Sequence, residues 1–408
     1  MAEVRLPFCQ PTLNSTGKTH RLDLFPLAQA GQSENLKGVS TLDQQPNSTR
    51  MKSKANRNSP SDEELDLLLK MVEISSPSHH EAKISAYLVD ALQARGFHAY
   101  QDDVSNAVGI IGNGEKTIVL LGHMDTVPGN IRVRIEDGKL FGRGAVDAKG
   151  PLACFINAAS RLRHQVDYLN KKIILIAAVE EEAATSRGAH EALQKFQSPD
   201  FCIIGEPSSW DAVTLGYKGR LLLDYELEIP LKHTAAQGKL VCEETIDFWN
   251  QIKAWCQPLN EGKGRFESID PTIRSFNSEN NGIYERAKAK FGFRLPVDFP
   301  LEKFKNFLVE AAGAAQLNFS GEEMAVRTGK SNALVKAFLQ SIRTHQGSPR
   351  FKVKTGTSDM NVVAPHWNCP LLAYGPGDSS LDHTPHEHIE IKEYGKSIDV
   401  LELVLQTI

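Results

Sequence analysis

Histidines and carboxylates follow strand-like segments of this chain, which is the arrangement that a metal site requires. An apolar run over 117–121 leads to His123 and Asp125, which alternate on one side of an extended backbone. Asp147 follows the glycine-rich segment GRGAV in a second turn. Zinc in proteins is bound by imidazole nitrogens and carboxylate oxygens, and a catalytic zinc keeps one position open for water. These three residues are therefore candidates for a catalytic metal site.

Each candidate also has a non-catalytic interpretation. His123 alone would be a hydrogen-bonded core histidine, but Asp125 can hold its second ring nitrogen and fix the tautomer. Asp147 could cap a helix that starts near Pro151, although an N-cap falls more naturally at 149–150. The alternative is that its carboxylate bridges two metal ions.

Further acids and histidines follow later strand-like runs. The acidic run 180–182 ends the apolar stretch IILIAAV, and Glu206 ends another such stretch. Acid runs are usually solvated, but at the end of a buried strand they are costly without a positive charge among them. Adjacent glutamates can divide the work of a hydrolase, one binding metal and one acting as general base. His383, His386 and His388 lie close together, and spacing alone does not separate them. The whole set predicts a two-zinc hydrolase.

The elements that must position these residues are alternating strands and helices. Between residues 61 and 213, apolar strand-like runs alternate with amphipathic helical runs, and the same alternation returns over residues 323–408. Strands that are apolar throughout are typical of a sheet covered by helices on both faces. We therefore predict a three-layer α/β sandwich with a mostly parallel sheet as the catalytic domain, in two parts.

Residues 214–322 have a different pattern and predict an inserted domain. The segment RLLLDYELEI alternates with period two, as a strand with one solvated face does. A helical run, two strands, a second helix and a closing strand follow. This β-α-β-β-α-β order is typical of a small α+β sandwich with an exposed antiparallel sheet.

Composition excludes several classes of function. The chain has 408 residues and a formal net charge of −4, so neither nucleic-acid binding nor a polybasic membrane patch is expected. No apolar stretch is long enough to span a bilayer. The six cysteines lack CxxC spacing, which favours reduced thiols in a cytoplasmic protein. Residues 1–60 are rich in Ser, Asn, Gln, Gly and Thr and show no sustained hydrophobic period, and we expect a disordered extension or a mis-assigned start with translation from Met51.

Five motifs in order, GHMDTVP, GRGAVDAKG, VEEEA, IIGEPS and GPG…DHTPHEH, resemble those of the dinuclear zinc aminoacylase and carboxypeptidase family, peptidase family M20. The resemblance extends from about residue 61 to the C-terminus. It implies two zinc ions per subunit, with cobalt as a substitute, held by His123, Asp147, Glu182, Glu206 and His383. Asp147 would bridge both ions, with a cis peptide to Ala148, and Asp125 would orient His123. Glu181 would be the general base.

The resemblance also separates the three clustered histidines and assigns residues outside the catalytic domain. The family's last ligand is followed by an acid, which His383 and Glu387 match. The insert resembles the family's dimerisation or lid domain, in which His233 matches a residue that stabilises the oxyanion in a neighbouring subunit. Arg294 matches a substrate-carboxylate arginine, and Thr357–Ser358 match a substrate-binding loop.

Within the family, the motifs look most like those of lysine and ornithine hydrolases. These enzymes release an amino acid from the C-terminal glutamate of a small acidic carrier protein, and the resemblance implies a homodimer. A basic rim for that carrier would come from Lys218, Arg220, Lys232, Lys239 and residues 343–354. The alternatives are a deacetylase of N-acetylornithine or N-acetyl-lysine, for which the substrate is a small N-acyl amino acid, and a non-catalytic binding protein of the same fold.

Overall fold

A computed structural model describes residues 59–408 apart from residues 198 and 234. The segment for which we predicted disorder or a mis-assigned start therefore lies, up to residue 58, outside the described residues.

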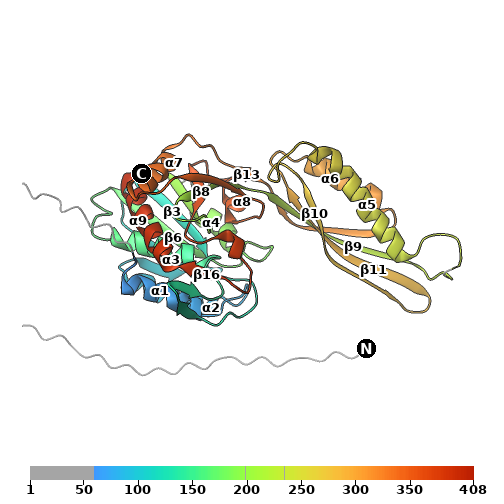
Figure 1. Ribbon diagram of the computed structural model, residues 1–408, viewed down its shortest axis with the longest axis horizontal. Coiled ribbons are helices and arrows are strands. Elements are labelled where there is room, and N and C mark those ends of the chain that lie inside the picture. Colours follow the sequence, from blue (N-terminus) through green and yellow to red (C-terminus); the bar gives the residue numbers. More distant parts are fainter. Residues whose placement is uncertain (1–58, 198, 234) are drawn as a thin grey trace, which may run out of the picture. The chain divides into compact units, whose positions relative to one another are not determined.

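A nine-stranded mixed sheet forms the centre of the α/β part of the chain (Figure 1). Its strands, in spatial order, are β1 (His98–Gln101), β2 (Ala107–Ile111), β6 (Lys171–Ala178), β3 (Lys116–His123), β7 (Phe201–Gly205), β15 (Leu371–Tyr374), β8 (Ala212–Tyr217) and β13 (Val326–Arg327), with β14 (Arg350–Lys354) also paired to β8. The four central strands β6, β3, β7 and β15 run parallel. The predicted mostly parallel central sheet is confirmed.

Helices cover both faces of this sheet. One face packs against α1 (Asp62–Glu73), α2 (Ala82–Ala94), α3 (Lys149–Arg161), α7 (Ala333–Thr344) and α9 (Ile391–Thr407). The other packs against α4 (Arg187–Lys195) and α8 (Asp359–Val363). Side chains of a strand point alternately to its two faces, so Leu120 of β3 joins the first core and Leu121 joins the second. This burial on both faces explains why the strands are apolar throughout.

Smaller elements complete the domain. Strands β4 (Arg134–Glu136), β5 (Lys139–Phe141) and β16 (His388–Glu390) form a three-stranded antiparallel sheet, and Ser379–Leu381 form a 3₁₀ turn. No helix in the described part of the chain is both long and apolar enough to span a bilayer.

Arg161 joins three helices of the first layer through ion pairs. Its guanidinium lies 2.7 Å from a Glu64 oxygen on α1, and 2.7 Å and 3.0 Å from Asp399 and Glu402 oxygens on α9. The side chain of Arg161 is only 14% exposed, so water compensates little of the charge on these groups.

The Arg161→Ala variant is expected to lose about 3–5 kcal/mol of unfolding free energy, because it leaves buried carboxylates without a counter-charge. Urea unfolding followed by circular dichroism measures the change. Lys139→Ala, which removes a surface pair with Glu390, is the control and should cost at most about 1 kcal/mol. If the two substitutions lowered the free energy of unfolding equally, the buried network would contribute no more to stability than an exposed ion pair.

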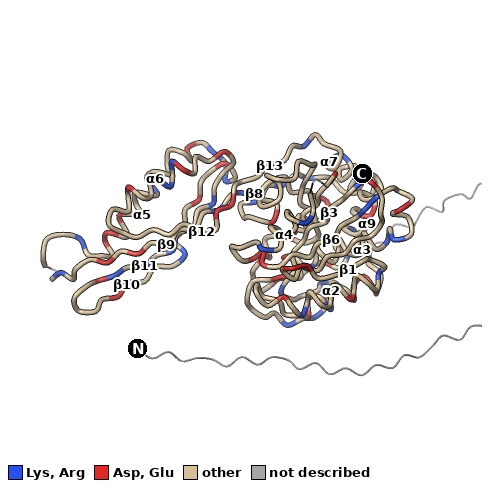
Figure 2. The backbone as a smooth tube through the Cα atoms, turned by 180° about the vertical axis from the view of Figure 1, so that it is seen from behind, with Lys and Arg blue, Asp and Glu red and all other residues tan. Residues whose placement is uncertain are grey.

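The second domain is a four-stranded antiparallel sheet with two helices on one face (Figure 1). Its elements in chain order are β9 (Gly219–Pro230), α5 (Val241–Asn260), β10 (Asp270–Asn280), β11 (Tyr284–Leu295), α6 (Leu301–Ala312) and β12 (Gln316–Glu323). The order β-α-β-β-α-β is therefore confirmed. Aromatic side chains of both helices pack on one face of the sheet. The ring centroids of Phe304 on α6 and Phe293 on β11 lie 4.9 Å apart. Charged residues recur along β9 and β11 (Figure 2), and on the other face Arg286 pairs with Glu228 and Lys290 with Asp224.

Candidate metal centre

The candidate residues meet at the carboxyl end of the central parallel strands. His123 is the last residue of β3, Glu206 directly follows β7, and Glu181 lies shortly after β6. Since β3 lies between β6 and β7 and runs parallel to both, the three strand ends lie side by side at one edge. Binding sites of α/β proteins form at this edge.

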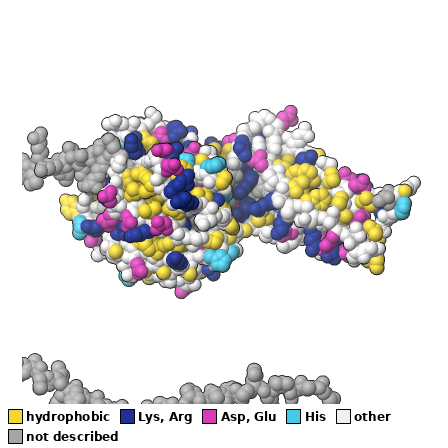
Figure 3. All heavy atoms as spheres, turned by 60° about the horizontal axis from the view of Figure 1, so that its bottom comes forward, with side chains coloured by type: hydrophobic (Ala, Val, Ile, Leu, Met, Phe, Trp, Pro, Cys, Tyr) yellow, Lys and Arg dark blue, Asp and Glu magenta, His cyan; other side chains and the backbone are white. Residues whose placement is uncertain are grey.

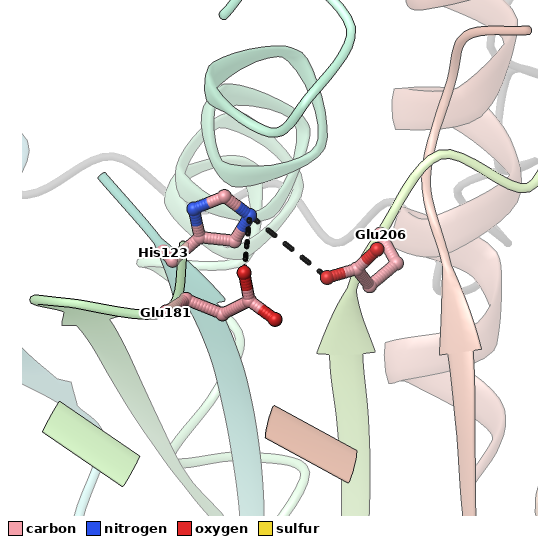
Figure 4. A group of neighbouring side chains, drawn as sticks. All are labelled: His123, Glu181 and Glu206. Carbon is pink, nitrogen blue, oxygen red and sulfur yellow. Dashed lines mark ion pairs between the residues drawn. The ribbon is translucent and has the colours of Figure 1, made fainter. Parts of the chain in front are cut away.

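The side chains form two groups with the spacing of metal ligands. In the first, His123 Nε2 lies 3.9 Å from an oxygen of Glu181 and 3.9 Å from an oxygen of Glu206, and both carboxylates point toward the ring (Figure 4). In the second, His383 Nε2 lies 2.8 Å from Glu182 Oε1 and 3.0 Å from Asp147 Oδ2.

Asp147 lies between the two groups. Its Oδ1 is 3.4 Å from His123 Nε2 and its Oδ2 is 3.0 Å from His383 Nε2, so one carboxylate faces both histidines. It does not cap α3, whose N-cap is Ala148 and has no side-chain cap bond. The peptide between Asp147 and Ala148 is cis, as the resemblance implied.

Of the three clustered histidines, His383 is the one whose ring contacts Asp147 and Glu182. The ring of His388 is hydrogen-bonded to the carbonyl of His386, and His388 belongs to β16. The backbone of His383 has a φ of 62°, a left-handed conformation that non-glycine residues adopt rarely.

A buried nitrogen without a partner tests whether a metal fits here. His123 Nε2 is fully buried and has no hydrogen-bond partner within the described structure, although carboxylates surround it. Buried polar atoms are almost always bonded, so such an atom calls for an explanation. A cation held by the imidazole nitrogen and the carboxylate oxygens fits, because this is the donor set that zinc takes.

The charges of the site point to the same conclusion. Burial raises the pKa of Glu206 to about 7 and, with further carboxylates nearby, raises the pKa of Glu181 well above its usual range. Burial also raises the pKa of Glu182, although His383 opposes this. Burial alone would lower the pKa of His123, but Asp125 and Asp147 raise it well above the usual range. The acids thus exceed the positive charge that the protein supplies, and a divalent cation corrects the imbalance.

Metal binding near neutral pH is expected to release protons from the metal-free protein. Hydrogen bonds to Asp147 and Glu182 raise the pKa of His383 to about 10, so its ring is charged below that pH and must lose a proton to become a ligand. Metal affinity should therefore rise as pH increases toward this value. Calorimetry in buffers of different ionisation enthalpy measures the released protons, and a binding enthalpy independent of the buffer would contradict the expectation.

Asp125 positions both His123 and the acidic segment. Its Oδ1 and Oδ2 accept hydrogen bonds from the backbone amides of Glu181 at 3.1 Å and Glu182 at 3.0 Å, and Ser78 donates to Oδ2 at 2.7 Å. His123 Nδ1 lies 3.3 Å from Asp125 Oδ1. The sequence suggested a contact between Asp125 and His123, but it contains no signal for the bonds to Ser78 and the two amides.

Two further charged residues support the centre. Glu387, which is fully buried, accepts hydrogen bonds from the backbone amides of Val146 and Asp147 and pairs with Arg143 at 2.7 Å. It thereby holds the turn that presents Asp147. Lys354 Nζ lies 3.6 Å from Glu206 Oε2. From the sequence we expected Lys354 only in a basic rim, and its contact with Glu206 was not predicted.

The remaining predicted site residues belong to neither metal-ligand group. His233 is exposed on the segment between β9 and α5, and its Nδ1 accepts a hydrogen bond from the backbone amide of Ala235. Arg294 donates to the hydroxyl of Thr357 at 3.1 Å. Ser358 is buried and caps α8 by accepting a hydrogen bond from the backbone amide of Met360.

The expected basic rim is only partly present. Lys218 is fully buried and its Nζ lies 2.6 Å from Asp270, so it cannot meet a partner protein. Lys239 pairs with Asp247. The prediction was wrong for Lys218 because it is the residue that joins β8 to β9, and the two sheets enclose it in a way that its local sequence does not reveal.

An α/β fold whose strand ends present two histidines among clustered carboxylates is typical of metal-dependent hydrolases. The model of Peptidase family M20/M25/M40 matches residues 119–407. A "[LysW]-lysine hydrolase" of Deinococcus radiodurans is 45% identical over 343 residues, covering 82% of this chain and 94% of that protein. A "Putative [LysW]-lysine/[LysW]-ornithine hydrolase" of Thermococcus kodakarensis is 38% identical over 346 residues, covering 85% and 92%.

Solved structures share the fold. An M20 family metallo-carboxypeptidase from Sulfolobus solfataricus superposes with a TM-score of 0.71 at 21% identity, covering 85% of this chain and 99% of that one. The chain belongs to peptidase family M20/M25/M40. It is a hydrolase that acts on amide bonds.

Proposed function

We propose that this protein is a zinc-dependent hydrolase that releases lysine, ornithine or both from the C-terminal glutamate of a small acidic carrier protein. The observation that carries the proposal is the 45% identity to a [LysW]-lysine hydrolase over 94% of that relative's length. The candidate metal centre supports it, because the predicted ligands and the predicted base all lie within it.

Two ions per subunit fit the two groups of side chains. In this proposal His123 and Glu206 would hold one ion, Glu182 and His383 would hold the other, and Asp147 would contribute to both. The ions supply a water molecule of lowered pKa and an electrophilic contact for the amide carbonyl. Zinc is the expected metal, with cobalt as a substitute, because the donors are imidazole and carboxylate.

Glu181 is the general base in this proposal. Burial raises the pKa of its carboxyl well above the usual range, which suits a group that takes a proton and later returns it. It would take a proton from the attacking water and deliver it to the departing α-nitrogen. Asp125 would hold His123 in the orientation that presents Nε2.

A homodimer through the inserted domain would complete the site. His233 is exposed, and among the described residues it contacts neither metal-ligand group of its own chain. In the proposed dimer, His233 of the partner subunit stabilises the oxyanion. Exposed apolar side chains on this domain, among them Ile246, Ile273 and Phe276, offer an interface. Sedimentation analysis of the full chain tests this, and a monomer with full activity would exclude it.

The substrate is tested by comparing the rates at which the protein hydrolyses four amides. Zinc-loaded protein is assayed against the lysine conjugate and the ornithine conjugate of the carrier, N-acetyl-lysine and N-acetylornithine. We expect the highest kcat/KM for a carrier conjugate. Hydrolysis of the acetylated compounds with none of either conjugate would assign the protein as a deacetylase instead. No hydrolysis by protein that holds zinc would favour a binding protein.

A further inference from the structure

The open face of the inserted sheet gathers arginines at one end. Arg220 of β9 and Arg294 of β11 are direct cross-strand partners, so their side chains share a face. The neighbouring residues Leu221, Phe293 and Leu295 are buried against α5 and α6, which places both arginines on the face without helices. Figure 3 shows Lys and Arg side chains gathered where the chain passes between the two domains.

A third arginine joins them from β10. Arg274 lies at the irregularity in the pairing of β10 with β11, and its side chain passes over Gly292. A Cβ atom on Gly292 would lie 3.1 Å from Arg274 Cδ, so the glycine leaves room for the arginine. Because Gly292 is two residues from Arg294 on the same strand, the two guanidinium groups occupy neighbouring positions of one face.

Cations elsewhere on this face are paired with acids, but Arg274 and Arg294 are not. Lys290 lies 3.0 Å from Asp224 and Arg286 lies 2.6 Å from Glu228. Among the described residues, neither Arg274 nor Arg294 has a carboxylate within 4 Å. Asp270, the strand partner of Arg294, is instead paired with Lys218.

Arg220 is better compensated than the other two arginines. It donates to the carbonyl of Gly321 at 3.0 Å and lies 3.8 Å from Glu323. Burial lowers the pKa of Arg294, and the charges of Arg220 and Arg274 lower it further. The three arginines therefore repel one another. Like charges held together on one face are unfavourable unless an anion binds among them.

This end of the sheet lies against the catalytic domain. Arg294 donates to Thr357 in the loop before α8, and Arg220 approaches the carbonyl of Ala184, two residues after Glu182. A molecule with an anion bound by these arginines can therefore also reach the candidate metal centre.

The proposed substrate has two such anions. Lysine joined through its α-nitrogen keeps its α-carboxylate, and a glutamate that forms an amide with one of its carboxyl groups keeps the other. The resemblance already assigns Arg294 to the carboxylate of the departing amino acid. We propose that Arg274, beside it on the same face, binds the free carboxylate of the glutamate. This inference rests on the proposed function and makes Arg274 a specificity-determining residue for a glutamyl acyl group.

The test compares two compounds that differ in one charge. N-acetyl-glutamyl-lysine, joined through either glutamate carboxyl, is compared with the same compound whose free glutamate carboxylate is capped as a primary amide. The wild-type protein should prefer the carboxylate by about tenfold or more in kcat/KM, as a charged hydrogen bond contributes. Arg274→Gln should reduce this ratio to near one. Arg294→Gln should lower kcat/KM for both compounds.

Lys290→Gln is the matched control, because it removes a cation of the same face that already has an acid partner. It should keep the wild-type preference. A preference that survives in Arg274→Gln, or that Lys290→Gln removes equally, would overturn the inference.

Failure of the proposed function has a separate signature. If the wild-type protein hydrolyses N-acetyl-lysine but neither glutamyl compound, the proposed substrate is wrong. The glutamyl compounds are then used as inhibitors of N-acetyl-lysine hydrolysis. Stronger inhibition by the carboxylate, lost in Arg274→Gln, would still support the anion site, and equal inhibition by both compounds would refute it.

Discussion

Glu181→Gln is expected to lower kcat by about 10²- to 10⁴-fold and to keep the metal content of the wild-type protein. The amide has nearly the shape of the carboxylate but cannot take a proton from water. Glu181 lies 3.9 Å from His123 Nε2, and its backbone amide is fixed by Asp125, so the substituted side chain should keep its place. Steady-state kinetics and elemental analysis of the same preparation measure the two quantities.

Glu180→Gln is the control for this result. Glu180 is adjacent in sequence and also buried, but its carboxylate pairs with Arg187 at 3.0 Å and accepts a hydrogen bond from Thr185, away from the candidate metal centre. Its kcat should stay within about tenfold of wild type. Loss of metal in Glu181→Gln would identify Glu181 as a ligand rather than a base, which its place in the group with His123 and Glu206 makes a real alternative.

The sequence predicts the central strands well and the peripheral strands poorly. Strands β3 and β6 are buried on both faces, so their apolar runs are visible without any knowledge of their neighbours. Strand β14 has the sequence RFKVK, and its side chains are half-buried or exposed. Its pairing with β8 depends on backbone hydrogen bonds rather than on apolar burial, and such pairing leaves no pattern in the sequence.

The candidate site likewise divides into residues that the sequence reveals and contacts that it does not. His123, Glu181 and Glu206 were found because charged residues directly after apolar strands are conspicuous. The choice of His383 required the family resemblance, since spacing did not separate it from His386 and His388. The contacts of Ser78 with Asp125 and of Lys354 with Glu206 join residues far apart in the chain, and the sequence on its own does not reveal them.

Asp147→Ala is expected to remove both metal ions with one substitution. The two oxygens of Asp147 face His123 and His383 separately, so the alanine deprives each proposed ion of a ligand and each histidine of its nearby carboxylate. Affinity for each ion should fall more than about 100-fold, since even residues that only orient ligands contribute 10- to 100-fold. Elemental analysis after dialysis and kinetics with added zinc measure the loss.

Comparison with single-ligand variants decides whether Asp147 is shared. His383→Ala removes a ligand of one proposed ion only and should retain the other, whereas His386→Ala alters a residue outside both groups and should retain both. If Asp147→Ala kept as much metal as His383→Ala, each ion would be held independently of the other. If it kept none, a single carboxylate would link the two ions, and the α/β domain would have to position that carboxylate before either ion could bind tightly. The bonds from the Val146 and Asp147 amides to buried Glu387 supply that positioning.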